Sequence, residues 1–337
     1  MKCRIYTDIR LVPAGVNPVI MLFPFFGAPQ VSADDPDFGR FDDYINAGND
    51  LFELSSREEC DVFVLPFDYS FDKRFESVIR EFIKEAKSFE KKVLLFYNAD
   101  DDTSIELENV IVFRTSFYLS KKRTYEYAFP GWSVDFLKAY SQGTLPETKH
   151  TDKPSVSYCG YVDYVDESWK IWLNNLFGRK KSKPWERLRG RAVRNVLQSS
   201  KVKAQFLIRD GFWASGVADK KAARQEYAEN MMSADYAICC RGGGNFSYRL
   251  YEVMSLGKIP VFINTDCVLP WMDEISWREI MVWVELDELD SLDQKVWHFH
   301  HLHQDRLCQI QQNIRNTYES HLSPVGFFSK LALFLKG

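Results

Sequence analysis

The sequence predicts an α/β fold in two lobes that face each other across a cleft, and three observations predict it. The chain has 337 residues, whereas a domain takes roughly 150 residues. Short apolar runs alternate with segments of helical periodicity in both halves, which is the pattern of α/β architecture. Between the halves, Ser141–Ser155 (SQGTLPETKHTDKPS) contains two prolines and no apolar periodicity, which is typical of a linker.

The first half, residues 1–145, predicts one α/β lobe. Four apolar runs are expected to form short buried strands: Val19–Phe23, Asp61–Leu65, Val93–Tyr97 and Val110–Phe113. Between two of them, Arg74–Phe89 places its apolar residues at helical spacing. This spacing predicts an amphipathic crossover helix.

The second half, residues 155–303, repeats the alternation. Strands are expected at Val156–Tyr161, Ala204–Ile208, Tyr236–Cys240, Pro260–Ile263 and Ile280–Val284. Helices are expected at Glu167–Phe177, Arg187–Gln198, Lys220–Met232, Ser247–Leu256 and Gln304–His321. Because open α/β sheets bind ligands at the carboxyl ends of their strands, both halves can present loops to the cleft.

Composition excludes some classes of function and indicates a compartment. The net charge of -4 and the pI near 5.9 argue against nucleic acid as a partner. The N-terminus has no apolar core of a signal peptide, and no apolar run reaches the ~20 residues that span a bilayer. The seven cysteines include no CxxC pair. This odd, scattered set favours reduced thiols and a cytoplasmic protein.

The most informative segment is Ala234–Asp266 (ADYAICCRGGGNFSYRLYEVMSLGKIPVFINTD). A strand runs into Arg241, Gly242, Gly243, Gly244 and Asn245, and a helix begins near Ser247. Glycines allow backbone N–H groups to approach a ligand, and a helix start favours a phosphate. Arg241 and Arg249 can add charge-assisted bonds to a diphosphate. The alternative is an ordinary glycine-rich turn before a helix with an exposed Arg–Glu pair.

The helix after the turn separates its apolar and polar residues. Leu250, Val253 and Met254 form the core-facing set, while Arg249 and Glu252 share another face. A carboxylate one turn beyond a phosphate-binding cation can accept hydrogen bonds from ribose hydroxyls. Arg209, at the end of another strand, is either a second phosphate ligand or a structural salt bridge.

These residues resemble a known family. Arg241–Glu252, followed by Leu256–Val261 and Asp266, is similar to the nucleotide-sugar segment of the exostosin-like glycosyltransferases, glycosyltransferase family 47. The resemblance continues through Leu269-Pro270, Ile275–Trp277 and Val282–Glu285. Upstream, Ser157–Tyr161 and Arg224–Asp235 also resemble that domain, and Leu65–Tyr69 resembles a weaker N-terminal signature. The strong part covers residues 155–290.

The resemblance implies a GT-B architecture, with the acceptor on residues 1–145 and the nucleotide sugar on residues 155–303. It implies an inverting, metal-independent transfer to a glycan or glycolipid acceptor in surface polysaccharide synthesis. No cofactor is expected besides the nucleotide sugar, and the expected donor is a uridine diphosphate sugar. Residues 304–337 are expected to pack across the lobes. Since the sequence shows neither an anchor nor secretory cysteines, it resembles the bacterial cytoplasmic branch.

The general base is expected from the first lobe, just past a strand end. Asp101 is the favoured candidate and Asp68 the second. The triplet Asp100–Asp102 also spells D-x-D, which leaves three alternatives: a solvated turn, the base, or the metal site of a GT-A-type transferase. A third function stays open, namely a catalytically silent subunit that binds a partner glycosyltransferase in a polymerase complex.

Two further clusters have more than one interpretation. The basic run Arg179–Lys183, continued by Arg187, Arg189, Arg191 and Arg194, is a solvated face or a peripheral contact with anionic lipid at the inner face of a membrane. The histidine-rich Trp297–Arg306 lacks a nearby cysteine to complete a zinc set, so no metal site is expected there.

Overall fold

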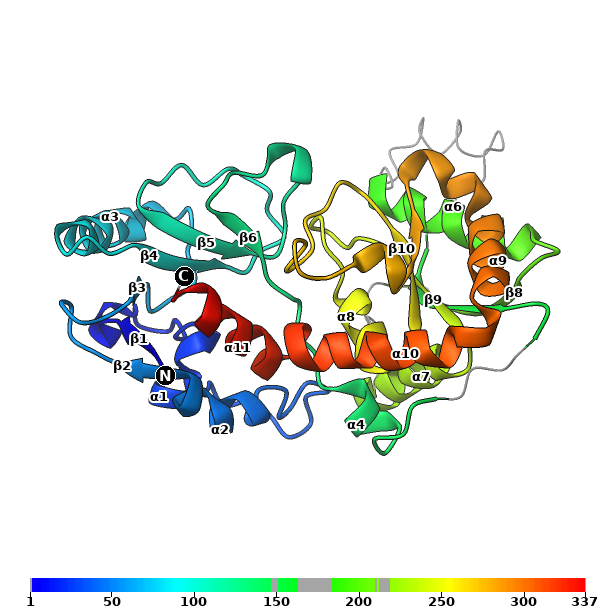
Figure 1. Ribbon diagram of the computed structural model, residues 1–337, viewed down its shortest axis with the longest axis horizontal. Coiled ribbons are helices and arrows are strands. Elements are labelled where there is room, and N and C mark those ends of the chain that lie inside the picture. Colours follow the sequence, from blue (N-terminus) through cyan, green and yellow to red (C-terminus); the bar gives the residue numbers. More distant parts are fainter. Residues whose placement is uncertain (1, 147–150, 163–183, 210, 212–218, 337) are drawn as a thin grey trace.

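A computed structural model describes residues 2–146, 151–162, 184–209, 211 and 219–336. The chain forms two lobes, each built on a parallel sheet (Figure 1). The N-terminal sheet has the strand order β2-β1-β3-β4-β5-β6, and the C-terminal sheet has the order β11-β10-β9-β7-β8. The predicted α/β fold with two Rossmann-like lobes is confirmed.

The N-terminal lobe contains the shorter strands. They are β1 (Cys3–Tyr6), β2 (Phe52–Leu54), β3 (Val62–Val64), β4 (Val93–Tyr97), β5 (Val110–Arg114) and β6 (Glu126–Ala128). Its helices are α1 (Phe23–Phe26), α2 (Asp42–Leu51) and α3 (Lys73–Ser88), the last of which is the predicted crossover helix. All five residues of β4 are buried, as expected for a parallel strand that is covered on both faces.

The predicted strand Val19–Phe23 is wrong. Ile20–Leu22 forms a 3-10 turn that leads directly into α1. Pro24 lies in the first turn of α1, where its fixed φ favours a helix start. The edge of the lobe's core, not a sheet, buries Met21 and Leu22.

The C-terminal lobe follows the predicted strands closely. They are β7 (Ser155–Tyr161), β8 (Lys203–Arg209), β9 (Tyr236–Cys239), β10 (Ile259–Ile263) and β11 (Val282–Val284). Its helices include α6 (Pro184–Gln198), α7 (Lys220–Met232), α8 (Tyr248–Ser255) and α9 (Leu292–Leu302). The helix expected at Glu167–Phe177 and the basic residues Arg179–Lys183 lie outside the described residues.

Strand β7 marks the position where this sheet can bind a ligand. The chain runs from β7 to β8 on one side and later returns to β9 on the other side, and all of these pairings are parallel. Such a reversal of strand order opens a crevice at the carboxyl ends of the two strands. The carboxyl ends of β7 and β9 therefore meet at one site.

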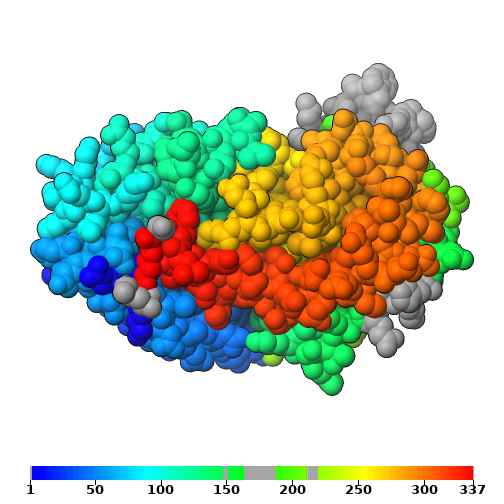
Figure 2. All heavy atoms as spheres, in the orientation of Figure 1, coloured from blue at the N-terminus to red at the C-terminus, as the bar shows by residue number. Residues whose placement is uncertain are grey.

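The C-terminal segment crosses from one lobe to the other. Helix α10 (Leu307–Thr317) contributes Leu307, Ile310 and Ile314 to the core of the C-terminal lobe. A π-helical turn follows, and α11 (Pro324–Phe334) buries Phe327 and Phe328 in the N-terminal core. The two helices form a continuous band over both lobes (Figure 2). Among the described helices, none combines the length and apolarity needed to cross a bilayer.

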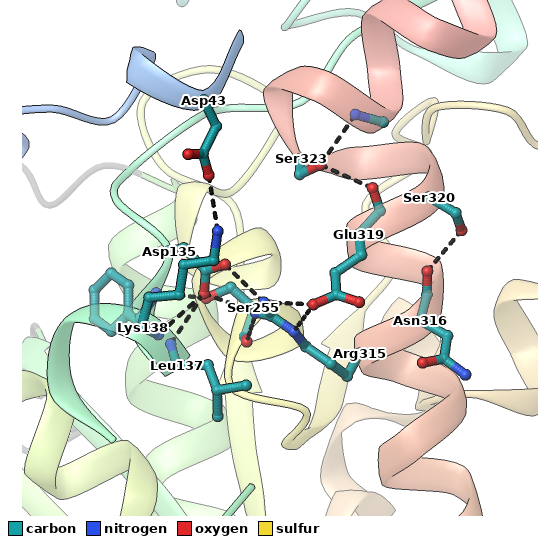
Figure 3. Close-up of polar contacts among 12 residues, drawn as sticks. Asp43, Asp135, Leu137, Lys138, Ser255, Arg315, Asn316, Glu319, Ser320 and Ser323 are labelled. Atoms are coloured by element: carbon teal, nitrogen blue, oxygen red, sulfur yellow. Dashed lines mark hydrogen bonds and ion pairs between the residues drawn. The ribbon is translucent and has the colours of Figure 1, made fainter. Parts of the chain in front are cut away.

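Arg315 fastens the two connections between the lobes to each other. Its Nη1 and Nη2 each donate to an oxygen of Asp135 at 2.7 Å, and Nη1 also donates to the Ser255 carbonyl oxygen (Figure 3). Asp135 in turn accepts from the first backbone N–H groups of α4 (Phe136–Tyr140), which follows the first crossing. Arg315 thus links Asp135, in the first connection between the lobes, to Ser255 at the end of α8.

Candidate functional site

A cavity of about 470 Å³ lies between the lobes at the carboxyl ends of β7 and β9. The ends of β7 and β8, helices α6, α7 and α8, and the glycine-rich loop supply most of its wall. The N-terminal lobe and the linker after it supply Asp37, Arg40, Asp100 and Ser133. The site therefore draws on both halves of the chain.

The cavity wall is positively charged. Six cationic side chains line it, namely Arg40, Arg189, Arg209, Lys220, Arg224 and Arg249, against three carboxylates, Asp37, Asp100 and Glu252. In a site sheltered from water, such a surplus attracts anions more strongly than it would at an open surface. The wall fits a ligand that carries about two or three negative charges.

Arg249, in the first turn of α8, lies at the centre of this charge. Its Nε donates to the Tyr227 hydroxyl at 3.1 Å, and its Nη2 donates to the Cys159 carbonyl oxygen at 2.6 Å. Its guanidinium also lies over the ring of Tyr158, 4.5 Å from the centroid. Both hydrogen-bond partners are neutral, so an anion in the cavity would supply the charge complement that they do not.

Gly160 at the end of β7 makes room for this arginine. Its φ is +148°, and a Cβ there would lie 3.2 Å from Nη2 of Arg249. A side chain would therefore require both an unusual backbone and a displaced guanidinium. The lack of a side chain at Gly160 therefore allows the Arg249 guanidinium to take its position at the cavity.

The glycine-rich loop differs from its predicted role. A Cβ on Gly243 would lie 2.8 Å from an oxygen of Asp100, and one on Gly244 would lie 2.8 Å from Ser116 Oγ and 2.9 Å from the Asp100 Cα. Two of the three glycines thus permit close contact with the N-terminal lobe. Gly242 and Gly243 both line the cavity, and a Cβ on Gly242 would have only the Phe246 carbonyl oxygen within 4 Å, at 3.8 Å.

Asn245 and Arg241 also hold the lobes together. The Asn245 backbone N–H donates to Ser116 Oγ at 2.8 Å, and its side chain bonds Phe117 and Thr265. Arg241 donates to the Tyr118 hydroxyl and to the Gly243 carbonyl oxygen, and it does not line the cavity. The structure thus places both residues outside the cavity wall, with bonds to the N-terminal lobe and within the C-terminal lobe, and their contact with a diphosphate stays a prediction.

Glu252 lines the cavity but is not open to a ribose. Its Oε1 accepts from Ser133 Oγ at 2.6 Å and from Arg224 at 3.0 Å, and its Oε2 accepts from the Tyr227 hydroxyl at 2.5 Å. The side chain is only 5% exposed. Glu252 therefore organises the polar wall of the cavity, and its contact with a ribose stays a prediction.

Two arginines from other elements join the site. Arg209 lines the cavity and pairs with Glu226 at 3.2 Å, so the predicted salt bridge is present and its role as a phosphate ligand stays a prediction. Arg189 on α6 is buried at the cavity and donates to the Arg241 carbonyl oxygen. Its place in a basic run suggested a solvated face, and only the packing of α6 against the loop reveals its position. Ser247 lines the cavity at the start of α8.

The carboxylates expected to supply the base separate into three environments. Asp101 accepts from the Tyr97 hydroxyl and from the backbone and hydroxyl of Thr103, and these bonds, led by the Thr103 hydroxyl, lower its pKa. It does not line the cavity, so the structure does not bring this predicted base to the site. Its neighbour Asp100 does line the cavity, whereas Asp102 is exposed outside it.

Asp68, the second candidate, also lies outside the cavity wall. Although its side chain reaches solvent, the protein around the carboxylate raises its pKa to about 6. It does not cap the following helix, because Asp72 holds that position. Among the described residues, no three His, Cys, Asp or Glu side chains gather as a metal-binding group, and the described histidines form no such set.

Two parallel-sheet lobes with a cationic cavity at a strand switch point define an α/β protein whose cavity suits an anionic ligand. The Exostosin GT47 domain matches residues 181–296, which include α6, α7, the glycine-rich loop and α8. Over these residues the chain is similar to the exostosin-like GT47 family.

Curated relatives match within a short stretch. "Probable glucuronosyltransferase GUT1" of Oryza sativa subsp. japonica is 44% identical over 69 residues, which is 20% of this chain and 16% of that protein. "Probable beta-1,4-xylosyltransferase IRX10" of Arabidopsis thaliana is 42% identical over 67 residues, again 20% of this chain and 16% of that protein. The matched stretch thus spans about a sixth of the length of these relatives.

Solved structures show a more distant likeness over a longer span. The glycosyltransferase WaaG is 11% identical with a TM-score of 0.37, and the alignment covers 99% of this chain and 100% of WaaG. TarM is 12% identical with a TM-score of 0.38 over 82% of this chain and 50% of TarM. The likeness to the GT47 family depends on residues 181–296 and not on these structures.

Proposed function

We propose that the chain is a glycosyltransferase that moves a sugar from a nucleoside diphosphate donor to a hydroxyl group of a glycan or glycolipid acceptor. The observation that carries this proposal is Arg249, a cavity-lining cation with neutral partners, inside a segment that matches the Exostosin GT47 domain. The GT47 relatives are named as glucuronosyl- and xylosyltransferases, which supports sugar transfer in polysaccharide synthesis.

The donor diphosphate would bind in the C-terminal half of the cavity. Arg249, Arg189 and the α8 start at Ser247 surround this space, and the open side of Gly242 lets a ligand approach the backbone. Charge-assisted bonds from arginine to phosphate are short and strong, and a helix start adds partial positive charge. These groups would stabilise the diphosphate as it leaves, with no divalent ion in the step.

The acceptor would enter from the N-terminal lobe. Transfer with inversion requires a base opposite the leaving diphosphate, and a positioned base contributes 10²–10⁴-fold. Asp100 is the carboxylate of the predicted triplet that faces the cavity, so we assign it this role in place of Asp101. The acceptor proton would pass to Asp100 as the new glycosidic bond forms and the bond to phosphate breaks.

Isothermal titration with UDP, and with UDP-glucuronic acid and UDP-xylose, tests donor binding. Each ligand should bind equally well with and without a chelator, because arginines replace the ion. A loss above tenfold under chelator would favour a metal-dependent site at Asp100–Asp102. If none of these ligands binds the folded protein, the donor proposal fails.

A further inference from the structure

The segment 27–41, here called the lid, connects α1 to α2 in the N-terminal lobe. It contains no helix or strand, and Gly27 (φ +83°) and Gly39 (φ +78°) near its ends adopt a backbone that other residues rarely take. Two ion pairs join it to α7 of the other lobe, Asp34 with Lys221 and Asp37 with Arg224. The lid therefore spans the mouth between the lobes.

One of these ion pairs reaches into the cavity. Asp37 lines the wall, and its Oδ1 accepts from Arg224 Nη2 at 2.7 Å. The same oxygen accepts from the Val134 backbone N–H at 3.2 Å, which ties the lid to the linker between the lobes. The Arg40 side chain adds a bond to the Trp132 carbonyl oxygen.

A continuous series of polar contacts runs from Asp37 to the phosphate-binding arginine. Arg224 donates to Glu252 at 3.0 Å, and the other oxygen of Glu252 accepts from the Tyr227 hydroxyl. That hydroxyl accepts from Arg249 Nε at 3.1 Å. Charges alternate from Asp37 through Arg224 to Glu252, and the neutral Tyr227 hydroxyl links Glu252 to Arg249, so each member holds the next in one orientation.

The middle of this series is sheltered from water. The side chains of Arg224 and Glu252 are 6% and 5% exposed. Burial by itself would lower the pKa of Arg224, but Glu252 and Asp37 more than offset it and hold the pKa above its usual value. A buried cation that loses one of two carboxylates is destabilised, so movement of Asp37 would disturb the whole series.

We propose that Asp37 is a positioning residue whose ion pair with Arg224 closes the lid and orients Arg249 for the donor diphosphate. The inference rests on the proposed function, since it concerns the same cavity. Closing the lid fixes Glu252, Tyr227 and Arg249 in sequence, and preorganised groups bind more tightly. By reciprocity, a diphosphate bound at Arg249 favours the closed lid.

Charge alone predicts the opposite effect of removing Asp37. A carboxylate in the wall repels an anion, so its neutralisation would raise UDP affinity by Coulomb's law. If Asp37 instead orients Arg249, Asp37→Asn lowers UDP affinity by about fivefold or more, the lower end of coupling between linked sites. Asp37→Ala, which removes the acceptor completely, should lower it further.

Asp34→Asn is the matched control. Asp34 lies on the same lid and pairs with the same helix, but its side chain is 91% exposed and reaches Lys221 at the surface. Exposed pairs contribute little, so UDP affinity should change by less than about twofold. Thermal unfolding without ligand should show that all three variants are folded.

Hydrogen exchange of residues 28–40 gives a second measurement on the unaltered chain. Saturating UDP should slow exchange there in the wild type and in Asp34→Asn, but much less in Asp37→Asn. Unchanged or higher UDP affinity in Asp37→Asn, or exchange in the wild-type lid that UDP leaves unchanged, would overturn the lid inference alone. Failure of the wild type to bind any donor would overturn the proposed function as well.

Discussion

Two parts of one continuous segment differ in what they contact. Gly243, Gly244 and Asn245 pack against Asp100 and Ser116 of the N-terminal lobe. Gly243 also lines the cavity, but most of the lining comes from the next residues through the first turn of α8, which include Arg249. The glycines of this turn therefore allow close packing between the lobes as well as access to the cavity.

The largest effect is expected at Asp100, the residue of the N-terminal lobe against which the glycine-rich loop packs. Asp100→Asn keeps the shape of the side chain but removes its basicity, so sugar transfer should fall at least 10²-fold. UDP affinity should stay within about threefold of the wild type, because the base acts on the acceptor. Steady-state transfer kinetics and UDP titration measure the two quantities.

Asp101→Asn is the control for that prediction, since Asp101 is bonded within its own loop. It should retain most of the transfer activity. Loss of activity in Asp101→Asn with full activity in Asp100→Asn would restore the original assignment of the base.

The two arginines of the segment should behave differently. Arg249→Ala should weaken UDP binding by roughly 1.5–3 kcal/mol, the range for a hydrogen bond to a charged group. Arg241→Ala should leave UDP binding nearly unchanged and should instead lower the midpoint of thermal unfolding, since its partners are Tyr118 and Gly243. Equal losses of UDP affinity in both variants would contradict the assignment of Arg249 to the cavity and of Arg241 to the contact between the lobes.

The glycines provide a test through stability. Gly244→Ala should reduce the free energy of unfolding by about 1–3 kcal/mol, the usual cost of overpacking, because its Cβ meets Ser116 and the Asp100 backbone. Gly242→Ala should cost less than about 0.5 kcal/mol, since the nearest atom is 3.8 Å from its Cβ. Urea unfolding of both variants checks this, and UDP titration should show that Gly242→Ala acts on binding instead.

The smallest effect concerns Asp68, which lies outside both parts of the segment. Its pKa of about 6 in the folded chain exceeds the ~3.9 of an unfolded aspartate. The folded state thus favours the protonated carboxyl group. The stabilisation of the folded state that results is complete below about pH 4 and is lost as the pH rises to 6. Asp68→Asn should be more stable than the wild type at pH 7 by less than about 1 kcal/mol, since solvent screens an exposed group.

Thermal unfolding of Asp68→Asn and the wild type between pH 4 and pH 8 measures that difference. The two midpoints should agree at pH 4 and separate between pH 4 and 6. A constant difference across this range would show that Asp68 does not titrate in the way its surroundings indicate.

Helices and strands were the features of the fold that the sequence predicted best. Helix α7 has the predicted bounds, and β4 is the predicted strand Val93–Tyr97. Their signals are local, since periodicity and apolar runs determine which face is buried. Val19–Phe23 failed because an apolar run between prolines can be buried without a sheet, and the short strand Cys3–Tyr6 carries no run long enough to stand out.

By itself the sequence determined the two α/β lobes, and it located the segment that includes Arg249 and contributes to the cavity wall. These depend on hydrophobic spacing and on a motif confined to neighbouring residues. Only the tertiary structure decided that Asp100 and not Asp101 faces the cavity, that Arg189 and Asp37 join it, and that Arg241 does not. The reason is that side-chain direction and the contact between lobes depend on residues more than a hundred positions apart, such as Ser116 and Asn245.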